Sequence, residues 1–235
     1  MVALDAALSD LKEKGPVDHT VCLGDVAAVG PQPKEAIAFL RKMKWPCVMG
    51  NSDEALAKST PEDYSHTDAS KEEKDSMVRL DRWTAAQLDA SDRQLLSSFK
   101  PTITIKTPSA SILCYHGSPR SNREGILATT PDAQISEMLG EHDALIYAGG
   151  HTHVQMVRRL KGAIVINPGS IGLPYEKDTN GRFRNPTWAE YSIVTVEGQD
   201  LGVELCRTRY DLAILEKRVR ASGLPEPDWW LDDWF

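Results

Sequence analysis

The sequence predicts an α/β protein in which two β-sheets pack together between outer layers of helices. The first half of the chain alternates amphipathic helical segments with short apolar runs, and the second half is a series of strand-like runs. The composition is that of a globular protein, with 41% hydrophobic and 26% charged residues. A length of 235 residues suits one large domain, so we expect a single domain over 1–235.

Helical spacing of apolar residues predicts helices over residues 2–14 and 33–44. Each helix is followed by a short apolar run, at 20–23 and 46–49. This rhythm implies right-handed crossovers and parallel pairing of the two runs. Residues 52–100 are mostly charged or serine, with apolar positions at helical spacing, and predict an insert of two or three helices over one sheet edge.

From residue 102 the pattern is mainly that of strands. Strands are predicted over 102–105, 111–115, 144–147, 154–159, 163–166, 191–196 and 202–206, and helices over 131–140 and 210–222. The loop 172–187 is long enough to cover a pocket as a lid. The aromatic tail 225–235 holds three of the six tryptophans. We expect the tail to dock on its own domain; the alternative is a homo-oligomer formed through it.

Charge and hydropathy exclude several classes of function. The balance of 27 Lys+Arg against 34 Asp+Glu gives a net charge of −7, which argues against bulk nucleic-acid binding. No apolar run approaches the roughly 18–20 residues of a membrane span, and the N-terminus lacks a secretory signal. The four cysteines are widely spaced in apolar runs, where buried structural thiols are expected. We therefore expect a cytoplasmic protein without membrane partners.

Side chains with metal-ligand chemistry follow four of the apolar runs, each beside a glycine. They are Asp25, Asn51, His116 and the pair His151 and His153. Because the carboxyl ends of strands in an α/β sheet share one edge, we expect these side chains to converge. A carboxylate, an amide and three imidazoles form an oxygen and nitrogen donor set suited to manganese, iron, zinc or similar ions.

Each of these residues also has a purely structural interpretation. Asp25 would end a strand, and Asn51 would cap a helix with Glu54 closing a capping box. His116, which precedes Gly117, would be a turn residue. His151 and His153 would lie on a strand with side chains on opposite faces. If all of these structural interpretations were right, the same pattern of a polar side chain beside a glycine would have arisen independently after four apolar runs. One shared site explains the repeated pattern more simply, so convergence of the side chains is favoured.

Five segments, in this order, resemble the calcineurin-like metallophosphoesterases, and within them the compact prokaryotic phosphodiesterase group. They are Leu-Gly-Asp25, Gly-Asn51-x-Asp53-Glu54, Tyr-His116-Gly-Ser, Gly-Gly-His151-Thr-His153 and Asn167-Pro-Gly-Ser170. The resemblance spans nearly the whole chain. It implies a four-layer α/β/β/α sandwich with a helical insert, and hydrolysis of a small phosphate ester or nucleotide by a metal-bound hydroxide.

The same resemblance implies a role for each candidate residue. Asp25 resembles the carboxylate that bridges two divalent ions, which would be Mn, Fe, Zn or Ni. Asn51, His116 and His151 resemble the other ligands of one ion, and His153 resembles a ligand of the second. Asp25, Asn51 and His116 are thereby the expected catalytic residues. The Asn167-Pro-Gly-Ser170 segment would bring backbone close to the site, or would be an ordinary turn.

The resemblance fails at the start of the chain. The family opens with a strand ending in Asp-x-His-Gly-Asn, whose Asp and His bind the ion that His153 would serve. No Asp-x-His occurs in the first fifty residues, and the chain opens on the segment matching the following helix. We expect an N-terminally truncated sequence in preference to an evolved loss, since removing an interior strand is costly. For such a truncated chain we expect the first strand of the family's fold to be absent, one of the two metal positions to be complete, and the hydrolytic activity to be impaired.

A second departure is Ser52, where the fuller family pattern has a histidine that protonates the leaving group. Serine has no pKa near neutrality, so good leaving groups such as nucleotide or aryl phosphodiesters are expected. Arg120 and Arg123 closely follow His116 and are expected to bind substrate phosphate, unless they are solvated loop charges. The rival function is a non-catalytic protein-binding module, as the retromer small subunit is within the family resembled.

Overall fold

The structure is a computed structural model that describes every residue except 66, 68, 180 and 199. Positions 66 and 68 fall in the predicted insert and 180 in the predicted lid, so those parts of the two predictions lie outside the described residues. No helix in the described part combines the length and apolar character needed to cross a bilayer.

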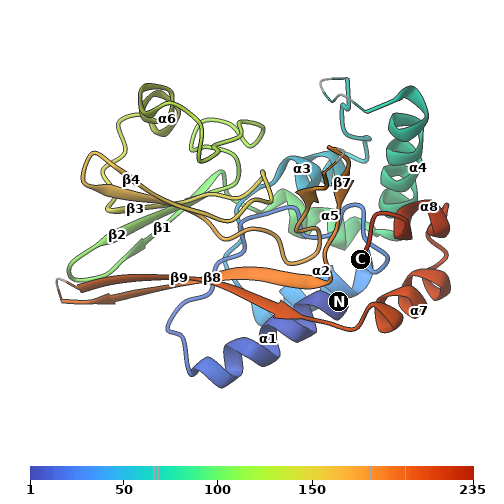
Figure 1. Cartoon of the computed structure of the whole chain (residues 1–235), viewed down its shortest axis with the longest axis horizontal. Coiled ribbons are helices and arrows are strands. Elements are labelled where there is room, and N and C mark those ends of the chain that lie inside the picture. The colour runs from blue at the N-terminus through green and yellow to red at the C-terminus, as the bar shows by residue number, and fades with distance from the viewer. Residues whose placement is uncertain (66, 68, 180, 199) are drawn as a thin grey trace.

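A mixed five-stranded sheet forms the centre of the fold (Figure 1). Its members are β1 Thr102–Lys106, β2 Ser111–Tyr115, β3 Ile146–Ala148, β4 Met156–Leu160 and β5 Ala163–Asn167. They lie in the order β1-β2-β3-β5-β4. The three inner strands β2, β3 and β5 run parallel, whereas the edge strands β1 and β4 are antiparallel to their neighbours. The carboxyl ends of the inner strands therefore meet at one edge.

Two further layers cover one face of this sheet and one covers the other (Figure 1). The long hairpin β8 (Trp188–Glu197) and β9 (Asp200–Arg209) packs Val194 and Val203 against Ile146 and Ile166 of the sheet. Helix α1 (Val2–Lys14) packs on β8 and β9. Helix α6 (Asp132–Leu139) packs Ile135 against the opposite sheet face. The predicted α/β/β/α order is confirmed.

The remaining helices form two apolar clusters beside the sheet. They are α2 Pro33–Met43, α3 Asn51–Ala57, α4 Lys71–Gln87, α5 Ala90–Ser97, α7 Leu212–Ser222 and α8 Pro227–Leu231. Leu40, Leu56 and Leu96 join α2, α3 and α5 in one cluster. Leu80 of α4 packs with Val219 of α7 in the other. The described residues of the region 52–100 thus form three helices, the upper limit of the prediction.

The runs 20–23 and 46–49 are shorter as strands than predicted. Their pairing is the predicted parallel one, but it is a single bridge between Cys22 and Cys47. Cys22 N donates to Pro46 O at 2.9 Å, and Val48 N donates to Cys22 O at 3.0 Å. The chain then turns at Asp25, which has φ 55°, while α3 begins at Asn51, so neither run can extend.

The predicted lid contains a short hairpin, β6 (Glu176–Lys177) and β7 (Phe183–Arg184). The C-terminal tail holds the end of this hairpin: Asn185 N donates to Asp233 O at 2.6 Å, and Phe235 N donates to Asn185 O at 3.1 Å. The tail itself packs on its own domain, because Trp230 and Trp234 are buried with Leu80. A homo-oligomer through the tail remains a prediction.

Removing the Trp230 side chain should destabilise the fold strongly. Trp230 is 7% exposed, and its Nε1 donates to Val29 O at 2.7 Å. We expect Trp230→Ala to lower the free energy of unfolding by about 3–5 kcal/mol, measured by urea denaturation followed by circular dichroism. Phe235→Ala, at a side chain 50% exposed, should cost about 1 kcal/mol or less. Equal losses in the two variants would contradict this assignment of the core.

Candidate metal centre

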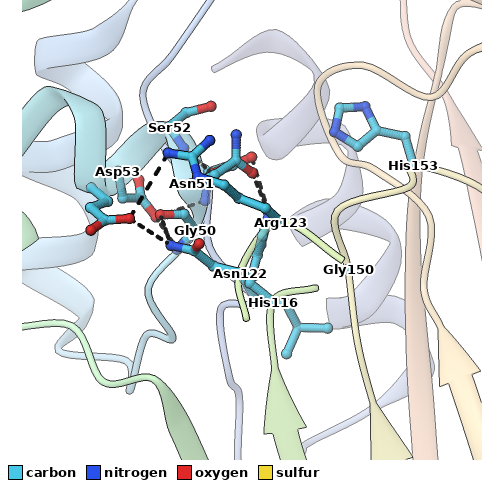
Figure 2. Close-up of polar contacts among 12 residues, drawn as sticks. Gly50, Asn51, Ser52, Asp53, His116, Asn122, Arg123, Gly150 and His153 are labelled. Carbon is cyan, nitrogen blue, oxygen red and sulfur yellow. Dashed lines mark hydrogen bonds and ion pairs between the residues drawn. The ribbon is translucent and has the colours of Figure 1, made fainter. Parts of the chain in front are cut away.

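The five predicted ligands lie at the edge of the fold where the inner strands end, four of them in loops and Asn51 at the start of a helix. Figure 2 labels three of them, Asn51, His116 and His153. Asp25 occupies the turn after the Cys22 bridge, and Asn51 is the first residue of α3. His116 directly follows β2. His151 and His153 lie in the turn between β3 and β4 rather than on a strand, so the opposite-face interpretation is wrong.

Three of these side chains form a compact cluster. Asp25, His116 and His151 each offer one ligand atom, and these atoms lie within 4.8 Å of one another. Asp25 Oδ2 is 3.2 Å from His116 Nε2, and the rings of His116 and His151 have centroids 5.1 Å apart. A carboxylate oxygen and two imidazole nitrogens at this spacing are the donors of a divalent transition-metal site.

The Asn51 amide adds a fourth donor to this cluster. Its Oδ1 lies 3.1 Å from His116 Nε2. The amide atom of Asn51 at this position also lies 2.9 Å from His151 Nδ1 and 3.3 Å from Asp25 Oδ2. An oxygen facing other acceptors is unfavourable alone, but it is the arrangement that a cation requires. Rotating the amide lets its nitrogen donate to the same atoms, which satisfies the site without a cation. With its oxygen turned toward the histidines, the Asn51 amide completes a donor set that fits a divalent cation.

Backbone conformation at the centre is unusual. Asp25, His151 and His153 have φ values of 55°, 64° and 56°, in the left-handed region that non-glycine residues rarely adopt. Such conformations cost on the order of 1–3 kcal/mol each and persist where the surroundings enforce them. One such constraint is close backbone packing: a Cβ on Gly24 would lie 2.7 Å from Gly50 N, so only glycine lets the two turns meet.

Backbone carbonyls orient two of the imidazole rings. His116 Nδ1 donates to Leu23 O at 2.6 Å, so Nε2 faces Asp25. His153 Nδ1 donates to Leu173 O at 2.8 Å, which leaves its Nε2 as the free ring nitrogen. Hydrogen bonds of this kind set the tautomer of a metal-binding histidine and hold its ring in position.

Electrostatics divides the cluster into a charged pair and a neutral ring. Burial opposes charge on both Asp25 and His116, but their mutual hydrogen bond and attraction lower the pKa of Asp25 and raise that of His116. Burial, reinforced by the nearby charge of His116, lowers the pKa of His151 to about 4. His151 is therefore neutral at physiological pH and offers a free nitrogen lone pair.

Asp53 supports the centre in a way that sequence reasoning missed. Its buried carboxylate accepts from the N–H groups of Asp25 at 2.7 Å, Val26 at 2.9 Å and Gly50 at 3.1 Å. Burial and the charge of Asp25 raise its pKa to about 7 despite these bonds. The capping-box interpretation with Asn51 as the cap is wrong, because Gly50 precedes the helix and Asp53 accepts its N–H. The sequence signal was an acidic residue two positions after Asn51.

Asn167 supports the other side of the centre. Its side chain, 2% exposed, donates to Gly150 O at 2.7 Å and to Thr152 Oγ1 at 3.0 Å, and accepts from Gly169 N at 2.9 Å. These bonds tie the turn that carries both histidines to the end of β5. The Asn-Pro-Gly-Ser segment thus positions a neighbouring loop, which is more than an ordinary turn does.

His153 stands apart from the cluster (Figure 2). Burial lowers its pKa, and the negative charge of Asp25 acts against this shift. Its ring lies 5.1 Å from that of Tyr175. The predicted role of His153 as a ligand of a second ion remains a prediction.

Both predicted phosphate-binding arginines contact carboxylates. Arg120 pairs with Glu124 at 2.7 Å and with Glu137 at 3.1 Å. Arg123 pairs with Glu62 through both terminal nitrogens. A substrate phosphate would have to compete with these carboxylates, so the substrate-binding role of both arginines also remains a prediction.

A four-layer α/β/β/α sandwich with carboxylate, amide and imidazole donors at one sheet edge defines a metallophosphoesterase. The chain belongs to this group: the calcineurin-like phosphoesterase superfamily domain matches residues 1–197. Membership of this family suggests metal-dependent hydrolysis of phosphoesters.

Similar proteins cover almost the whole chain. An uncharacterised protein of Methanocaldococcus jannaschii is 24% identical over 246 residues, spanning 98% of this chain and 90% of that protein. A metallophosphoesterase from Sphaerobacter thermophilus is 26% identical, with a TM-score of 0.69 over 99% of this chain and 92% of its own. A hypothetical protein from Pyrococcus horikoshii OT3 has a TM-score of 0.73 at 22% identity over 96% and 90%, which shows the shared fold.

Metal affinity should rise with pH. In the metal-free centre Asp25 keeps a proton on His116 to a pH above the ordinary value of 6.5, and an incoming cation must displace that proton. Protons therefore compete below the His116 pKa and cease to compete above it. Calorimetric titration with Mn²⁺ between about pH 6 and about pH 8 should show tighter binding and less proton release as pH rises. Affinity that does not change with pH would contradict the Asp25–His116 pairing.

Replacing Asp53 should weaken metal binding although Asp53 is not itself a predicted ligand. Asp53→Ala leaves three backbone N–H groups unpaired and frees the Asp25 turn from α3, so metal affinity should fall about 10- to 100-fold. The matched control is Asp92→Ala, since Asp92 is another buried carboxylate, which accepts from Asp89 N at the start of α5. That variant should lose stability but keep its metal affinity. The same affinity loss in both variants would rule out a positioning role for Asp53.

Proposed function

We propose that the protein is a divalent-metal-dependent phosphodiesterase for small phosphodiesters with good leaving groups, such as nucleotide or aryl esters. The observation that carries this proposal is the convergence of Asp25, His116 and His151, with the Asn51 amide beside them, in a chain of the phosphoesterase family. The location expected from the sequence, the cytoplasm, belongs to the same proposal, since all four cysteines are free.

The residues present divide between two proposed ion positions. Asp25, Asn51, His116 and His151 would hold one cation, and Asp25 with His153 would contribute to a second. Bound divalent cations polarise phosphoryl oxygens and lower the pKa of water, which is the chemistry that phosphodiester hydrolysis needs. Mn, Fe, Zn and Ni all accept such mixed oxygen and nitrogen donors.

The protein supplies position and charge around that chemistry. The Ser52 N–H donates to Asp25 Oδ1 at 2.9 Å, which fixes the carboxylate with Oδ2 toward the histidines. The negative charge of Asp25 would offset the repulsion between two bound cations. Ser52 offers only a hydroxyl as a proton donor, so the leaving group must depart without help from an acid of suitable pKa. This favours aryl and nucleotide leaving groups over alkoxides.

The second position is proposed to be impaired in this chain. Of the ligands that the family resemblance assigns to it, the sequence contains Asp25 and His153 but not the Asp-x-His pair. We therefore propose one complete ion position and weak hydrolysis by the 235-residue chain.

A non-catalytic protein-binding module is the second candidate. The carboxylate partners of Arg120 and Arg123 favour it, because they occupy the side chains expected to bind phosphate. A binding module of this kind would fold normally, but its metal centre would not hydrolyse any phosphate ester.

The decisive assay compares two substrates with added Mn²⁺. We expect slow hydrolysis of bis-p-nitrophenyl phosphate, loss of the activity with a chelator, and no faster turnover of a simple alkyl phosphate. His151→Gln should reduce the rate to that of the chelated protein, because it removes a predicted ligand with a free lone pair. The control His19→Gln, at an exposed histidine, should leave the rate unchanged. Faster alkyl turnover, or an active His151→Gln variant, would contradict the proposal.

A further inference from the structure

A row of three rings leads from the candidate metal centre to solvent. The ring of His153 lies 5.1 Å from that of Tyr175, and Tyr175 in turn lies 5.1 Å from Phe183 in an edge-to-face contact at 74°. Phe183 ends the row with 52% of its surface exposed. Only two ring contacts thus separate an exposed aromatic face from a predicted metal ligand.

The position of Phe183 is held by contacts of the hairpin β6–β7. Next to Phe183, Arg182 pairs with Asp232 at 2.6 Å and with Asp233 at 2.9 Å. On its other side, Arg184 Nε donates to Asp233 O at 3.3 Å. An aromatic ring fixed in this way loses little conformational freedom when a ligand stacks on it, which favours binding.

A positive charge lies over one face of the same ring. Lys177 faces Phe183 across the hairpin, and its Nζ is 4.8 Å from the ring centroid. An exposed aromatic face with an adjacent ammonium fits a flat aromatic group that carries a phosphate, whereas an alkyl phosphate gains only the charge.

We propose that Tyr175, Lys177 and Phe183 form a subsite that binds the nucleobase or aryl group of the substrate by stacking on Phe183. The subsite rests on the proposed function for its role in catalysis, and it narrows the substrate class to phosphodiesters with an aromatic substituent. The subsite and Ser52 favour the same substrates for different reasons. The subsite would bind the aromatic substituent, whereas Ser52 favours aryl and nucleotide esters because they are good leaving groups.

The test compares adenosine 5′-monophosphate with ribose 5-phosphate, which carry the same phosphate and differ in the base. Affinities are measured by calorimetry or ligand-observed NMR on the whole chain, once with Mn²⁺ and once with a chelator. Phe183→Ala should weaken nucleotide binding about five- to tenfold and leave ribose 5-phosphate unchanged. Phe183→Trp should keep nucleotide binding, because it keeps a stacking surface. Ile214→Ala, at an equally exposed apolar residue on α7, should affect neither ligand.

The outcomes separate this inference from the proposed function. Equal weakening of both ligands, unchanged nucleotide binding in Phe183→Ala, or no nucleotide binding by the unmodified protein would each overturn the subsite. A Phe183-dependent preference for the nucleotide in a protein that hydrolyses no ester would support the subsite and contradict the proposed phosphodiesterase.

Discussion

One buried carboxylate holds the candidate site together. Asp53 accepts hydrogen bonds from three backbone N–H groups, two on the turn of Asp25 and one at the start of the helix that carries Asn51. Two segments joined by a single strand-type bridge are thereby fixed side by side. Because buried N–H groups must be paired, the separation of these two ligands depends on Asp53 more than on the sheet.

The centre gathers groups that would be unfavourable without a partner. Left-handed backbone at Asp25 and His151 and the burial of the His151 ring, which opposes its charge, raise the energy of the metal-free fold. A divalent cation would relieve the electrostatic part of this cost. The rest is offset elsewhere, for example by the packing of Trp230 and Leu80 between α4, α7 and the tail.

Most of the architecture could be predicted from the sequence because its signals are local. Periodicity locates helices such as 2–14 and strands such as 111–115 closely. Strand 154–159 begins later than predicted because His153 still belongs to the turn, and such backbone conformations leave no trace in hydropathy. The hairpin β6–β7 and the role of Asp53 depend on contacts between segments distant in the sequence, which no local pattern encodes. The donors that converge were recognisable from residue type and position after apolar runs.

We infer that side chains from three loops and the start of α3 meet around one cation. Anomalous X-ray diffraction from crystals soaked in Mn²⁺ tests it most directly, since it locates the ion without reference to activity. We expect a peak in contact with Asp25 Oδ2, His116 Nε2, His151 Nδ1 and the Asn51 amide oxygen. A peak elsewhere, or none in crystals that diffract well after soaking, would contradict it.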